Sequence, residues 1–276
     1  MFTFRSLYWR LYSLSAIAIT LFALLQLLRG EWQWLAPLLA WAPLPLLNLW
    51  RRFKANVGYL DERERPVMTL TLIAVAMVLV TGERDLPLWF TLAGLFGLLL
   101  FLFVASALPR GLREQKGRPE SLSELEFRSA GGEAVSLQPL LQQGSVLVLF
   151  LHSGSQVYSR MALRELQQWL EQGRATVPAQ QIVALFPGQI PSWSDSVSTL
   201  GVNCWQDSEG SSLIELGLWL RGGNAGFTGG AHAARPALAV LQPGQSKPQL
   251  WQVANNYRLP PSLTILQPKI DRLVAK

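Results

Sequence analysis

The sequence predicts an α-helical membrane region joined to an α/β three-layer sandwich. Composition is the first observation: half of the 276 residues are hydrophobic and 15% are charged, against about 25% charged residues in a soluble domain. The second is a change along the chain, because long charge-free stretches end near residue 109 and short apolar runs follow them. We expect a membrane region at 1–109, a polar linker at 110–121 and a folded domain at 122–276.

The first region predicts four transmembrane helices, because each of its charge-free stretches has about the 17–25 residues that cross a hydrocarbon core. Only a helix satisfies its own backbone groups there. The second stretch is the weakest prediction, since Pro37, Pro43 and Pro45 would kink it or make it a re-entrant or interfacial segment. Gly94 and Gly97 could allow a close helix contact. The four stretches are residues 11–28, 32–50, 66–82 and 86–109.

The basic residues predict an orientation. With four crossings, 11 Lys or Arg residues lie on the side of the N-terminus and only two, Arg29 and Arg84, lie on the other. This bias predicts an integral membrane protein, of the inner or plasma membrane if the chain is bacterial, with both termini and the C-terminal domain in the cytoplasm. The net charge of +6 belongs entirely to residues 1–118. We therefore expect the lipid bilayer, and no nucleic acid, as a partner.

The second region alternates short buried strands with helices. Val146–Leu151 and Ile182–Phe186 are continuous apolar runs, as in strands that are buried on both faces. A helix follows each of them, and an antiparallel strand pair precedes a closing helix, which is the order of the thioredoxin fold. The expected strands are 124–128, 133–137, 146–151, 182–186, 202–205, 237–241 and 250–254, and the expected helices are 157–172, 192–200, 211–218 and 262–274.

The segment VLVLFLHSGSQVYSRMALRELQQW, residues 146–169, resembles the active-site segment of the alkyl-hydroperoxide-reductase/thiol-specific-antioxidant family. In this peroxiredoxin-like family, a buried strand runs into F-x-R-G-x-W-C-P-x-C and then a helix with an L-R-x-L pattern. Phe150, Tyr158 and residues 163–166 match that pattern. Residues 202–218 and 235–271 resemble the family's later turn, final hairpin and Y-R-x-P. The resemblance covers about residues 122–274 and implies a thioredoxin-fold redoxin domain of an antioxidant family.

The chain departs from the family at its reactive positions. Gln156 stands at the position of the peroxidatic cysteine and Ser159 at that of the second cysteine. Peroxide reduction needs a thiolate, and a carboxamide has no equivalent nucleophile. We expect a pseudoenzyme without peroxidase activity that acts as a binding or interaction module, with a protein partner whose identity the sequence does not reveal.

Several residues remain candidates around this degenerate site, which comprises Ser155, Gln156, Tyr158 and Ser159. A serine at 153, 155 or 159 could simply cap the helix. His152 would lie near the opening of this site, where it would act as a base or as a hydrogen-bonded group. Two further candidates follow from the resemblance: Arg235, where the family has an arginine that supports the thiolate, and Pro236, where the fold has a cis-proline.

Two other functions stay open. The first is an antioxidant thiol oxidoreductase that uses Cys204 or a cysteine of a partner, although Cys204 lies in a predicted strand and matches neither family cysteine. The second is a membrane-assembly or transport accessory. One cysteine and two distant histidines predict no metal site, and we expect no cofactor.

Overall fold

The computed structural model describes residues 4–54, 57–61, 63–81, 84–105, 119–153, 156–220 and 233–275. The chain divides into two compact units. A helical unit comprises Phe2–Lys54 and Leu60–Ala107, and an α/β unit contains most of the remaining chain.

The helical unit is built around the short helix α2, which packs against α1, α4 and α5. Its interior is apolar and includes Ala16, Ala40, Leu98 and Phe101. The helices are α1 (Phe4–Leu28), α2 (Leu35–Trp41), α3 (Pro43–Phe53), α4 (Arg65–Thr81) and α5 (Leu86–Leu100), with a 3-10 turn η1 (Trp32–Trp34) and a π-helical turn η3 (Phe101–Ala105).

Close contacts join these helices at two glycines of α5. A Cβ at Gly94 would lie 2.9 Å from the Cβ of Ala40, and one at Gly97 would lie 2.6 Å from Cε2 of Tyr12. The hydroxyl of Tyr8 donates to the carbonyl oxygen of Gly97 at 2.6 Å. The small residues therefore let aromatic side chains reach the α5 backbone, as the sequence suggested for Gly94 and Gly97.

The described part of the structure does not contain the four long transmembrane helices that the sequence predicted. Among the described residues, two helices are long and apolar enough to cross a membrane, Arg10–Leu28 and Leu86–Ala105. Helix α4 has 17 residues, which is about 26 Å. The single helix expected at 32–50 is wrong, because the chain breaks between α2 and α3. Pro43 and Pro45 have no N–H to donate to the preceding turn, and α3 starts at the first of them.

The α/β unit contains a seven-stranded sheet in the order β2-β1-β5-β4-β3-β6-β7. Strands β3, β4 and β5 are parallel, and the other neighbouring pairs are antiparallel. The strands are β1 (Glu126–Ser129), β2 (Ala134–Ser136), β3 (Val146–Phe150), β4 (Ile182–Phe186), β5 (Asn203–Gln206), β6 (Ala237–Leu241) and β7 (Leu250–Val253). The helices are α7 (Gln138–Leu141), α8 (Val157–Glu171), α9 (Asp195–Ser198), α10 (Ser211–Glu215) and α11 (Leu263–Val274), with 3-10 turns at Leu122–Glu124, Ala179–Gln181 and Ser192–Ser194.

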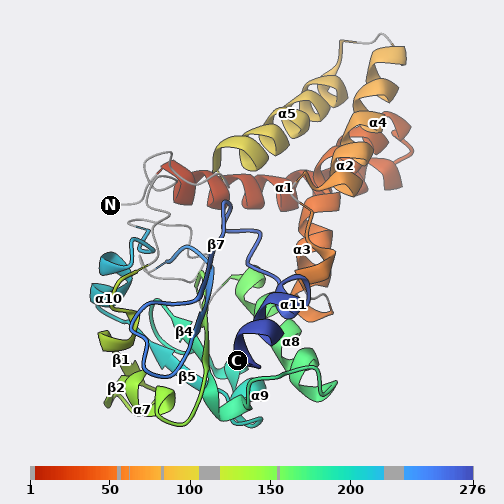
Figure 1. The fold of residues 1–276 in the computed structure, drawn as a ribbon. Helices are drawn as coiled ribbons and strands as arrows, with labels where there is room; N and C mark the ends of the chain where they lie inside the picture. Colours follow the sequence, from red (N-terminus) through yellow and green to blue (C-terminus); the bar gives the residue numbers. More distant parts are fainter. Residues whose placement is uncertain are drawn as a thin grey trace. The chain divides into compact units, whose positions relative to one another are not determined.

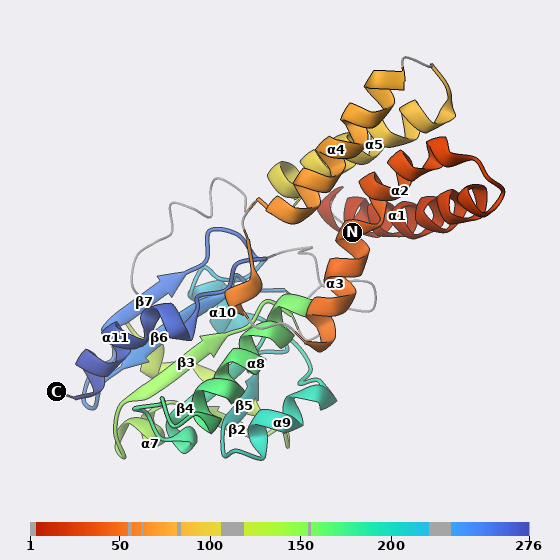
Figure 2. The same ribbon diagram turned by 90° about the vertical axis from the view of Figure 1, so that its right-hand side faces the viewer.

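Helices cover both faces of this sheet (Figures 1 and 2). Helix α8 packs against α9 and α11, and Leu141 of α7 and Leu213 of α10 share a core cluster with Val148 of β3. The parallel β3–α8–β4 connection, the antiparallel β6–β7 hairpin and the closing α11 form the thioredoxin arrangement. The predicted α/β sandwich is thus confirmed, although α9 and α10 are shorter than the expected helices at 192–200 and 211–218.

Candidate functional site

The candidate site lies where β3 ends and α8 begins. All five residues of β3 are buried, and Gln156 is the N-cap residue of α8. The carboxyl ends of parallel strands are where open α/β sheets bind their ligands. Ser155, one of the candidate residues, lies outside the described part of the chain.

Ser159 holds the loop before α8 in place. It lies in the first turn of the helix, and its Oγ accepts a hydrogen bond from the backbone N–H of Ser153 at 3.1 Å. Gln156 is 3% exposed and its side chain makes no cap hydrogen bond. The N-cap residue itself is thus a glutamine and not one of the three serines. The hydroxyl of Ser159 binds backbone that precedes the helix, because its position in the first turn brings it back to the loop.

His152 is built into the end of β3. It is 1% exposed, and its Nδ1 lies 2.6 Å from the carbonyl oxygen of Ala234. A carbonyl can only accept, so Nδ1 carries a proton and donates it to this oxygen. The imidazole stacks on Tyr257, with 4.7 Å between ring centroids. Tyr158 meets the same Tyr257 edge to face at 6.0 Å.

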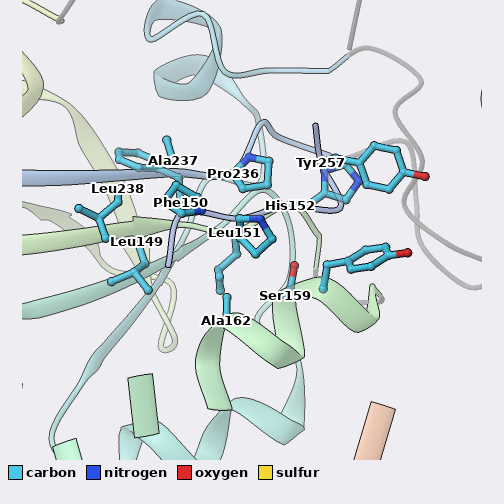
Figure 3. Close-up of a pocket in the computed structure, with 13 residues that line it drawn as sticks. Leu149, Phe150, Leu151, His152, Ser159, Ala162, Pro236, Ala237, Leu238 and Tyr257 are labelled. Atoms are coloured by element: carbon cyan, nitrogen blue, oxygen red, sulfur yellow. The ribbon is translucent and has the colours of Figure 1, made fainter. Parts of the chain in front are cut away.

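These side chains surround a narrow pocket, open in part to solvent, that has room for about one water molecule. Figure 3 shows Ser159 and Ala162 on one side of α8, turned toward Leu151, His152 and Pro236. Apolar walls with a few polar groups are typical of sites for small ligands or single side chains. The lining residues are Leu149, Phe150, Leu151, His152, Tyr158, Ser159, Ala162, Pro236, Ala237, Leu238, Tyr257, Pro260 and Pro261.

Arg235 lies beside the pocket and does not line it. Its guanidinium is fully buried, and Nη2 donates to the carbonyl oxygen of Ala254 at 3.2 Å. Pro236 does line the pocket. No described peptide bond is cis, so the expected cis-proline at Pro236 is wrong. The trans form is the intrinsically favoured one, and the Arg235 N–H is satisfied in it by Leu218.

Cys204 lies on β5, which is separated from β3 by β4. Burial raises the pKa of its thiol to about 11, and the negative charge of Asp195 acts in the same direction, against a hydrogen bond with Ser194 that lowers it. At neutral pH the thiolate that would react is therefore scarce. The structure does not bring this thiol to the pocket.

Two residues that shape the site were missed as candidates. Tyr257, which covers His152, stands in the Y-R-x-P segment of the resemblance. Glu165 is 4% exposed on α8 and its carboxylate accepts four hydrogen bonds from the start of α11. In the sequence, this role of Glu165 could have been noticed because its carboxylate stands between the apolar residues Leu163 and Leu166.

Among the described residues, no three His, Cys, Asp or Glu side chains are grouped as metal ligands.

No protein-family model matches the chain, and no curated protein matches its sequence. Solved structures are similar to a part of it. Peroxidoxin BcpB from Mycobacterium tuberculosis has 10% sequence identity and a TM-score of 0.42, and the match covers 56% of this chain and 97% of that one. Reduced Prx3 with hydrogen peroxide from Vibrio vulnificus has 14% identity and a TM-score of 0.43, over 55% of this chain and 97% of that one.

A mutant of Peroxiredoxin 6 of Arenicola marina has 15% identity and a TM-score of 0.44, with coverage of 57% of this chain and 73% of its own. All three are peroxiredoxins or peroxidoxins by name. They show what the α/β unit is similar to, and its thioredoxin-like fold rests on the strand order described above.

Proposed function

We propose that this chain is an integral membrane protein whose thioredoxin-like unit binds a ligand or protein partner and performs no thiol chemistry. The observation that carries the proposal is the first turn of α8, where Gln156 and Ser159 stand in place of the two cysteines of the family that the sequence resembles.

The chemistry of the reaction supports the loss of activity. A peroxidatic thiolate attacks one oxygen of the peroxide, the O–O bond breaks, and the sulfur becomes a sulfenic acid. The amide of Gln156 cannot be oxidised in this way, and the hydroxyl of Ser159 already accepts a backbone hydrogen bond. The raised pKa of Cys204 and its place on β5 disfavour this cysteine as a substitute nucleophile.

Binding is supported by the pocket itself. Its apolar walls suit a small apolar group or a side chain of a partner, and His152 and Ser159 place polar atoms among them. Tyr158 and Tyr257, which are both buried, add aromatic rings to these walls.

Membrane anchoring is supported by exposed apolar surface. All but two of the described large hydrophobic side chains that are exposed belong to the helical unit; the exceptions are Ile214 and Ile265. Burying such a side chain is worth about 1.5–3 kcal/mol, so lipid would solvate this surface much better than water. With four crossings, of which η1 and α2 would form the second, the basic residues favour cytoplasmic termini and a cytoplasmic α/β unit. A reporter fused after Lys276 tests this orientation, and activity of a reporter that works only outside the cytoplasm would contradict it.

A peroxidase assay tests the loss of thiol chemistry. The full-length protein in mild detergent is given hydrogen peroxide with thioredoxin or dithiothreitol. We expect consumption no faster than with the reductant alone, and no difference between the wild type and Cys204→Ser. Faster consumption that Cys204→Ser or Ser159→Ala abolishes would overturn the proposal.

A pocket variant tests binding. Ala162 lines the pocket, so Ala162→Leu fills it, while Glu171→Gln changes an exposed residue at the end of the same helix. Affinity capture of the full-length protein from mild detergent, followed by mass spectrometry, should lose partners with the first variant and keep them with the second. Equal capture by both would contradict binding at this pocket.

A further inference from the structure

We propose that α3 lies along the membrane surface, with one apolar face in the acyl-chain boundary of an anionic bilayer, and does not continue the membrane crossing. This rests on the proposed membrane anchoring. It assigns a lipid-binding surface to a segment that a straight second transmembrane helix would have buried in the hydrocarbon core.

Aromatic contacts show where the second crossing ends. The ring of Trp34 meets Phe22 of α1 at 4.9 Å, and that of Trp41 meets Tyr12 of α1 at 5.6 Å. Between these contacts the chain runs back along α1 toward its N-terminal end. Tyr12 is only two residues inside the apolar span Arg10–Leu28. At Trp41 the chain has therefore returned to the edge of the apolar layer.

The end of α5 lies at the same level, because Phe101 stacks on the ring of Tyr12 at 6.0 Å. Helix α3 starts two residues after Trp41, at Pro43. In Figures 1 and 2 it runs on beyond the end of α2. The residues of α3 thus extend past the edge that α1, α2 and α5 share.

An apolar stripe follows one side of α3. Leu46, Leu49, Trp50 and Phe53 have the i, i+3, i+4, i+7 spacing of one helix face, and they are 60%, 56%, 42% and 61% exposed. Beyond the hydrocarbon core, exposure of such large apolar side chains to water is unfavourable. A helix in the bilayer surface has this composition, with tryptophan at the headgroup level and an apolar face about 5–10 Å deep.

The opposite side of α3 is fixed to the protein. Arg51 is 1% exposed, and its two terminal nitrogens donate to the two carboxylate oxygens of Glu64 at 2.8 and 2.7 Å. Glu64 directly precedes α4. A paired, planar contact of this kind sets the rotation of α3 about its axis, and it leaves the stripe facing outward.

Basic residues at the end of α3 indicate which lipid headgroups this helix contacts. Arg52 and Lys54 are exposed at the end of α3, and Arg63 and Arg65 are exposed before and at the start of α4. The described acidic residues near them, Asp61 and Glu64, already pair with Arg65 and Arg51. Juxtamembrane basic residues of this density attract anionic headgroups, so phosphatidylglycerol-type lipids complement this end of the helix.

Spin labelling tests the proposal in the full-length protein. In a Cys204→Ser background, single cysteines at Leu46, Leu49 and Phe53 report on the stripe, and a cysteine at Arg52 reports on the side away from it. The labelled proteins are reconstituted in vesicles of phosphatidylcholine with phosphatidylglycerol. We expect oxygen accessibility to exceed nickel-chelate accessibility severalfold at the three stripe positions, at one shallow depth, and the reverse at Arg52.

The proposal would be overturned if the depth of the labels in the bilayer increased steadily from Phe53 to Leu46, because α3 would then cross the hydrocarbon core. Stripe labels as accessible to the nickel chelate as the one at Arg52 would also overturn it. If the stripe labels lay equally deep in vesicles of phosphatidylcholine alone, the assignment to anionic lipid would be overturned. Labels at Leu21 of α1 and Leu72 of α4 separate these failures from failure of the membrane anchoring, which would leave both of them in water.

Discussion

Removing the carboxylate of Glu165 should loosen α11 and with it one wall of the pocket. Its Oε1 accepts from the hydroxyls of Ser262 at 2.6 Å and Thr264 at 3.0 Å and from the Thr264 N–H at 3.3 Å, and its Oε2 accepts from the Leu263 N–H at 3.1 Å. The negative group also faces the positive end of the α11 dipole. Pro260 and Pro261, just before this cap, line the pocket.

The magnitude follows from this geometry. A hydrogen bond to a charged group contributes about 1.5–3 kcal/mol, and bonds that share one acceptor are not additive. We therefore expect Glu165→Ala to lower the free energy of opening of α11 by about 3 kcal/mol, and Glu165→Gln, which keeps one carbonyl oxygen, by about half of that. A loss of 3 kcal/mol corresponds to roughly hundredfold faster amide exchange.

Hydrogen exchange followed by mass spectrometry on peptides that cover α11 measures this change in the full-length protein. Glu171→Gln is the matched control, because Glu171 is exposed on the same helix and its loss should cost less than about 0.5 kcal/mol. Exchange of α11 in Glu165→Ala that stays close to the wild-type rate would refute the idea that this carboxylate holds the helix.

Three other predictions follow from single contacts. Ser159→Ala removes the acceptor of a backbone N–H before α8 and should lower the free energy of unfolding by about 1 kcal/mol, measured by chemical denaturation. Because only the thiolate reacts and its pKa is raised to about 11, alkylation of Cys204 should accelerate about tenfold per pH unit between about pH 8 and 10; a plateau below that range would contradict the burial. Gly97→Ala forces a Cβ against Tyr12 and should lower the thermal stability in detergent by the equivalent of about 1–3 kcal/mol. Ala93→Leu, at an exposed position of the same helix, should have little effect.

Much of the α/β unit follows from local patterns. Strands β4 and β6 have the predicted bounds because each is a continuous apolar run, and all of their residues are buried. Helix α11 begins one residue after the expected start, since Ser262 is its N-cap. Because local composition determines these elements, a short window of the sequence is sufficient to predict their bounds.

The contacts that shape the site are not local. Glu165 meets the start of α11 across 97 to 99 residues of chain, and His152 meets Ala234 across 82. No spacing rule connects positions so far apart, so these partners emerge only when the sheet is assembled. The helical unit shows the intermediate case. Its prolines predicted a disturbance at 32–50, and only the packing around Trp41 shows where the chain breaks.

The polar groups at the end of β3 are better explained as supports than as reactants. Each of them makes a hydrogen bond that holds a part of the protein itself. Ser159 uses its oxygen to hold the Ser153 N–H, His152 uses Nδ1 on Ala234, and Glu165 uses both oxygens on α11. Each of these bonds fixes one wall of the pocket. A site whose polar groups rigidify its walls is preorganised for binding, which is why the shape of the pocket, and not a reactive atom within it, is the property that mutagenesis should address first.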